Sequence, residues 1–159
     1  MTAVAPRAGS PPETRLLLFE VSGTTFALPI ADVLEVMEIA PIAGIPGLPR
    51  RLAGVMNHHG DALPVVSREA LFEVSEANLV PARHVLVLAE RGGEAGHLGV
   101  PVDDVVGLAD AALGPPQLGE LVAERLSLRD RVTSVLEARR LVARAAALIE
   151  MSSVPVGTR

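Results

Sequence analysis

The chain contains no cysteine, no tryptophan and no tyrosine, and it has only three phenylalanines, Phe19, Phe26 and Phe72. Without cysteine it forms no disulfide, offers no thiol nucleophile and builds no thiolate metal site. Nucleic-acid-binding proteins rely on aromatic faces for base stacking and on a basic surface for phosphate contacts. The scarcity of aromatic residues and the net charge of −5 therefore argue against a nucleic-acid partner.

Long apolar runs and the common catalytic motifs are also missing. No stretch of 18 apolar residues occurs, and residues 1–15 lack the continuous apolar segment of a signal peptide. We therefore expect a cytoplasmic protein without direct membrane insertion. GxGxxG, GxxxxGK, HExxH and GxSxG patterns are absent from the sequence. We accordingly expect no enzymatic activity, no catalytic residues and no bound cofactor.

What the sequence does contain is an internal repeat. Residues 27–36, ALPIADVLEV, resemble residues 99–108, GVPVDDVVGL, and the offset is 99 − 27 = 72 positions. Two flanking pairs keep a similar offset, LLLFEV at 16–21 with VLVLAE at 85–90, and PVVSREAL at 64–71 with SVLEARRL at 134–141. Three matching segments in the same order indicate that one β unit was duplicated.

Short β-type runs separated by glycine and proline make up most of the chain. We expect strands at 16–22, 25–30, 52–56, 62–66, 83–90, 96–102, 105–108, 121–126 and 131–136. Turns at 23–24, 57–61, 91–95 and 129–130 join successive strands into hairpins, an apolar segment at 32–39 leads into a loop rich in proline and glycine, and a second loop is expected at 109–117. Helices are expected at 67–72, with Ser67 as N-cap, and at 137–151. The predicted organisation is a disordered tail at 1–15, one domain at 16–150 with lobes at about 16–82 and 83–150, and a flexible tail at 151–159. The fold class is all-β, two small barrels with a C-terminal helix.

Polar residues with a possible function are few. Glu35 interrupts the apolar run VLEVMEI, so it either has a hydrogen-bonding or cationic partner or lies exposed on an edge strand. His58 and His59 are adjacent, with Asp61 two residues further on. Adjacent strand residues point to opposite faces, so the two imidazoles are not expected to share one metal ion unless the turn bends sharply. We therefore predict no metal site.

The order of several spaced residues carries a family resemblance. These residues are Phe26 to Ile30 (FALPI), then Val33, Glu35 and Val36, then Pro46, Pro49, Gly54, Val55, Asn57 and Gly60, and then Pro64 to Val66 (PVV). This pattern resembles the CheW-like coupling-protein family of bacterial chemotaxis, and the likeness extends over about residues 16–150. The resemblance implies two SH3-like five-stranded β-barrels. It also implies a non-catalytic adaptor between the cytoplasmic tips of chemoreceptors (methyl-accepting chemotaxis proteins) and the regulatory domain of the chemotaxis histidine kinase.

The resemblance also implies a receptor-facing surface, at which the glutamate of a VxEV motif lies near the arginine of an NLRG motif. The glutamate corresponds to Glu35, but the arginine position holds His59 and the preceding leucine is His58. The interface is predicted at Glu35, Val36, Asn57, His58, His59 and Gly60. Imidazole carries a charge only when protonated, whereas guanidinium is always charged, so we expect weaker or differently directed receptor binding.

Further departures from the pattern are Ser67, where the family has aspartate, and Arg68, where it has leucine. The two copies of the repeat also differ, since the position of Glu35 is taken by Gly107 in the second copy, and the NHHG turn by Leu128 to Arg131. The receptor contact is therefore expected in the first copy alone. An alternative function is small-molecule or metal sensing by a turn containing His58, His59 and Asp61.

Overall fold

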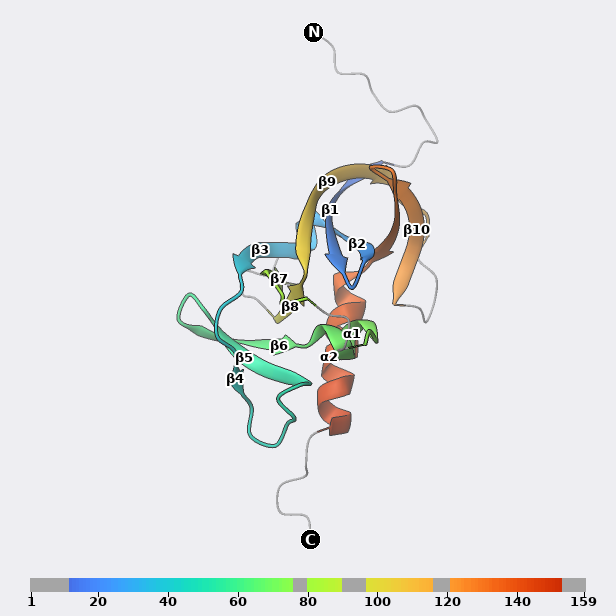
Figure 1. Ribbon diagram of the computed structural model, residues 1–159. Helices are drawn as coiled ribbons and strands as arrows, with labels where there is room; N and C mark the ends of the chain where they lie inside the picture. The colour runs from blue at the N-terminus through green and yellow to red at the C-terminus, as the bar shows by residue number, and fades with distance from the viewer. Residues whose placement is uncertain (1–11, 76–79, 90–96, 116–120, 153–159) are drawn as a thin grey trace.

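The computed structural model describes residues 12–75, 80–89, 97–115 and 121–152, which form two curled β-sheets and two α-helices (Figure 1). The five-stranded sheet has the order β10 (Val122–Leu128), β11 (Arg131–Leu136), β2 (Thr24–Pro29), β1 (Glu13–Val21) and β9 (Asp104–Ala112). The six-stranded sheet has the order β3 (Val33–Glu38), β7 (His84–Leu88), β8 (Leu98–Val102), β6 (Asp61–Val66), β5 (Ala53–His58) and β4 (Ala43–Gly44). A 3₁₀ turn, η1 (Ile30–Asp32), separates β2 from β3.

The repeat is visible in the pairing of the strands, but the two copies are interleaved. Hairpin β1–β2 of the first copy pairs with β9 and β11 of the second copy, and hairpin β7–β8 of the second pairs with β3 and β6 of the first. The contacts correspond one to one, because β1–β9 and β7–β3 are antiparallel while β2–β11 and β8–β6 are parallel. Each sheet therefore draws strands from both copies, and the predicted lobes at 16–82 and 83–150 do not coincide with the sheets.

Most predicted elements are confirmed, with differences at their ends. β1 begins at Glu13, so residues 13–15 are strand rather than tail, and β9 continues to Ala112 through part of a predicted loop. The two-residue strand β4 was not predicted; it adds a sixth strand to the second sheet. The predicted turn at 91–95, the tail at 1–11 and the tail at 153–159 lie outside the described residues.

Helices α1 (Arg68–Phe72) and α2 (Ala138–Ser152) cover a core shared by both sheets (Figure 1). Ser67 caps α1 as predicted, since its hydroxyl accepts a hydrogen bond from the Ala70 N–H at 3.3 Å. Arg144 of α2 donates to the carbonyl of Leu71 at 2.9 Å and so joins the two helices. The shared core contains Phe19, Leu28, Val66, Leu71, Leu86, Val100, Leu136 and Leu141, all buried. Two smaller clusters lie apart from it, one in each sheet.

One buried ion pair links segments that are distant in sequence. The guanidinium of Arg68, at the start of α1, donates to Oδ1 of Asp103, which lies between β8 and β9. The second oxygen, Oδ2, accepts the backbone N–H of Ser22 in the β1–β2 turn at 2.9 Å. Both charged side chains are only about a tenth exposed, at 10% and 11%. Arg68, which replaces the leucine of the family pattern, therefore serves as the counter-ion of a carboxylate that fixes a hairpin turn.

The close approach of β4 and β5 explains why the family pattern has a glycine at position 54. At this position β5 runs beside β4, and the backbones approach so closely that an added Cβ would overlap the Ile42 side chain and lie 2.7 Å from the carbonyl oxygen of Ala43. Glycine is the residue that permits such a close backbone approach. Among the described residues, no helix is long and apolar enough to cross a membrane.

Candidate functional site

Glu35 lies in β3, the strand at one end of the six-stranded sheet order. Side chains along β3 alternate, with Leu34, Val36 and Glu38 exposed and Glu35 half-buried between Val33 and Met37. Alternation of this kind is the period of a β-strand. Glu35 thus projects from the face opposite to Val36 and toward the end of the β5–β6 hairpin.

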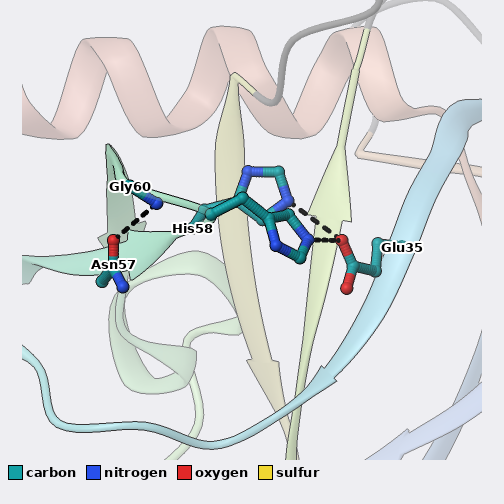
Figure 2. A network of polar contacts seen from close by, with 5 residues as sticks. Glu35, Asn57, His58 and Gly60 are labelled. Carbon is teal, nitrogen blue, oxygen red and sulfur yellow. Dashed lines mark hydrogen bonds and ion pairs between the residues drawn. The ribbon is translucent and has the colours of Figure 1, made fainter.

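The β5–β6 hairpin turns through two residues, His59 and Gly60, with φ values of 51° and 91°. Positive φ at both central positions is the conformation of a tight hairpin turn that follows the twist of the strands. Below the turn, Asn57 Oδ1 accepts the Gly60 N–H at 2.9 Å and closes it (Figure 2). His58 is the last residue of β5 and is buried, whereas His59 stands on the turn and is exposed.

Both imidazoles reach the same oxygen of Glu35. Nε2 of His58 lies 3.1 Å from Glu35 Oε1, and Nε2 of His59 lies 2.8 Å from it (Figure 2). The two rings are 4.6 Å apart between centroids. An ionised carboxylate only accepts hydrogen bonds, so each ring carries its proton on Nε2 and donates it. Hydrogen bonds from His59 and from His58 hold the pKa of the Glu35 carboxyl below its usual range.

The structure thus brings together three of the predicted interface residues and corrects one expectation. His58 and His59 were expected to point to opposite faces; the positive φ at His59 instead turns its ring to the side of His58. We call Glu35, His58 and His59 the Glu-His-His cluster. Of the other predicted residues, Asn57 and Gly60 close the turn, while Val36 is exposed on the other face of β3. Asp61 faces His58 across the hairpin register and is not part of the cluster.

The second copy of the repeat has the same backbone arrangement but different side chains at the equivalent positions. Its equivalent hairpin, β10–β11, turns at Arg129 and Asp130, both with positive φ. The guanidinium of Arg129 occupies the space above Gly107, where a Cβ would overlap it. A carboxylate facing two imidazoles in the first copy is therefore replaced by a glycine beneath an arginine, and the cluster exists in the first copy alone within the described residues.

Apolar side chains are also exposed on the other face of β3 and on the segment that follows it. Leu34 and Val36 of β3, together with Ile39 and Ile42 of the segment that follows, are each between 39% and 41% exposed. We call these four residues the aliphatic patch. Separately, a cleft of about 680 Å³ opens between β10, β11 and α2, and Ala123, Val135, Ala138 and Val142 line it along with Glu124. Large aliphatic side chains exposed on one strand and on the segment that follows it are candidates for a contact with a protein partner.

The family assignment follows from a comparison with family models. The model of the CheW-like domain matches residues 15–146 of this chain. The chain belongs to the CheW-like domain family. A solved structure, the scaffolding protein TtCheW from Thermoanaerobacter tengcongensis, superposes with a TM-score of 0.65 at 19% sequence identity, covering 84% of this chain and 90% of that one. The comparison with curated proteins finds no match.

The two SH3-like barrels implied by the sequence resemblance are confirmed by this likeness of fold, and family and fold together are those of a chemotaxis scaffold or adaptor. The Arg68–Asp103 pair was not foreseen from the sequence. Its one signal was the presence of an arginine at a position where the CheW-like pattern has an apolar residue, which indicates a buried partner.

Proposed function

We propose that this CheW-like chain is a non-catalytic cytoplasmic adaptor that couples the cytoplasmic tips of chemoreceptors to the regulatory domain of a chemotaxis histidine kinase. In this role it works by protein contact alone. Neither nucleic acid nor direct membrane insertion is needed, because the receptors supply the attachment to the membrane.

The observation that carries the proposal is the Glu-His-His cluster of the first copy. Glu35 stands where the receptor-facing glutamate of the family is expected, and it is held in place by two hydrogen bonds from a tight turn. Fixing a charged side chain before binding lowers the entropy cost of the contact. The aliphatic patch supplies exposed apolar area, with Leu34 and Val36 on the face of β3 opposite to Glu35. Apolar contacts combined with one oriented charge give both affinity and orientation to a protein interface.

Charge reversal at Glu35 tests the receptor contact. Glu35→Arg places a cation beside two imidazoles and presents the wrong charge to the receptor, so the affinity for a receptor-tip fragment is expected to fall by about tenfold or more. His59→Arg is expected to keep the affinity or raise it, because guanidinium can pair with Glu35 permanently. Isothermal titration calorimetry against the tip fragment measures the affinity of each variant.

A matched control is Asp110→Arg, which reverses an exposed carboxylate on β9 that pairs with Arg15 at 3.0 Å. This strand is the counterpart of β3 in the other copy, so the control has the same kind of charge change at the equivalent strand. Receptor affinity is expected to stay at the wild-type value. If Glu35→Arg and Asp110→Arg weaken binding equally, or neither does, the first copy does not carry the contact.

A further inference from the structure

The Glu-His-His cluster has the ligand set of a transition-metal site. Its three potential ligand atoms, one carboxylate oxygen and two imidazole nitrogens, all lie within 4.8 Å of one another. Imidazole nitrogens combined with one carboxylate suit borderline ions such as Zn²⁺, Co²⁺ and Ni²⁺. Calcium and magnesium prefer oxygen ligands throughout, so two nitrogens select against them.

Distances in the cluster are close to those that a metal requires. Ligand bonds of 2.0–2.1 Å in a tetrahedral site place neighbouring ligand atoms about 3.3 Å apart. The two Nε2 to Oε1 distances, 3.1 Å and 2.8 Å, fall a few tenths of an ångström short of that value. These two contacts therefore need to lengthen by only a few tenths of an ångström to admit an ion between the carboxylate and the imidazoles.

The three ligand side chains differ in burial, so one is fixed in place and two can move. The side chain of His58 is 11% exposed, while those of Glu35 and His59 are 36% and 69% exposed. His58 is held by its strand, whereas Glu35 and His59 have room to rotate toward an ion. Because the cluster opens to solvent through His59, water can fill the remaining coordination position, as it does in open zinc sites.

We propose that Glu35, His58 and His59 form a site for one divalent transition-metal ion of the Zn²⁺ class, bound through a carboxylate oxygen and both Nε2 atoms. Metal binding replaces the two N–H···O hydrogen bonds with metal–ligand bonds, and each neutral ring then carries its proton on Nδ1 instead. The site is confined to the first copy of the repeat, because the equivalent positions hold Gly107 and the Arg129 guanidinium. This proposal is separate from the adaptor role, since it concerns the isolated chain.

Metal titration of the chelator-treated, tag-free full chain tests the site. Zn²⁺ is expected to bind at one ion per chain by calorimetry, and Co²⁺ is expected to give the visible absorption of a four- or five-coordinate complex. Glu35→Gln and His59→Gln each remove one metal ligand. Each is expected to weaken Zn²⁺ binding by about a hundredfold or more, because losing even a residue that only hydrogen-bonds a ligand costs about tenfold to a hundredfold. Both residues are solvent-accessible, so the variants are expected to fold, and circular dichroism checks this.

His97→Gln is the matched control, because His97 is an exposed histidine outside the cluster. Its Zn²⁺ affinity is expected to equal that of the wild type. Absence of saturable Zn²⁺ binding would overturn the proposal. So would Zn²⁺ binding that the Glu35 and His59 variants leave unchanged, or that His97→Gln weakens as much as they do. None of these measurements involves a receptor or a kinase, so their failure leaves the adaptor proposal to its own test.

Discussion

Asp103→Asn is expected to lower the free energy of unfolding by about 3–5 kcal/mol, the usual cost of removing one partner of a buried ion pair. The substitution keeps the shape of the side chain and can still accept the Ser22 N–H, but it leaves the Arg68 guanidinium buried without a counter-ion. Since small domains are stable by only about 5–15 kcal/mol in total, this is a large part of the stability of the chain.

Urea denaturation followed by circular dichroism measures the effect. In the double variant Arg68→Met with Asp103→Asn, both charges are gone, so most of the lost stability is expected to return. Asp110→Asn, at the exposed Arg15–Asp110 pair, is the matched control and is expected to leave the midpoint unchanged. An equal, small effect of Asp103→Asn and Asp110→Asn would show that the buried pair does not hold α1 and the β1–β2 turn together.

Leu141→Ala is expected to lower the free energy of unfolding by about 2–5 kcal/mol. Leu141 lies on α2, is fully buried, and belongs to the core cluster that receives side chains from both sheets and from α1. Truncation removes apolar contacts within this shared core and leaves a cavity there. Because that core is common, the two sheets are expected to unfold in a single transition in the wild type and in the variant.

Thermal and urea denaturation, each with two spectroscopic probes, measure the change in stability and the number of transitions. Arg139→Ala removes an exposed side chain from the same helix and is the control for a change in helix propensity. It is expected to shift the midpoint only slightly. Two separate transitions in the wild type, or a loss of stability in Leu141→Ala no greater than that in Arg139→Ala, would mean that α2 does not unite the two sheets.

Sequence reasoning found the duplicated unit but not the exchange of strands between its copies. Turn residues reveal hairpins, and β1–β2, β5–β6 and β10–β11 were all expected from their turns. Pairing between distant strands has no local signal in the sequence. The sequences of β3 and β9 are similar, so either strand could pair with either hairpin. The long-range pairs β1–β9 and β3–β7 depend on how the whole chain packs.

At the candidate site, the sequence left open whether Glu35 has a partner or lies exposed, and the family pattern placed the possible partner at position 59, where His59 contacts Glu35. The simultaneous contact of His58 was missed, because strand alternation was applied across a residue that adopts positive φ. Asp103 was missed for another reason. Its partner is 35 positions away in the sequence, and both residues are of a type usually found on the surface.

Co-sedimentation of three components tests the adaptor role most directly. Receptor-containing membranes are mixed with the chemotaxis histidine kinase, with or without this CheW-like chain, and the kinase in the pellet and its autophosphorylation are measured. We predict that the kinase enters the pellet and responds to the receptors only when the chain is present. Glu35→Arg is expected to remove most of this effect, whereas Asp110→Arg is expected to leave it unchanged. Equal sedimentation and equal response of the kinase with and without the chain would contradict the adaptor role.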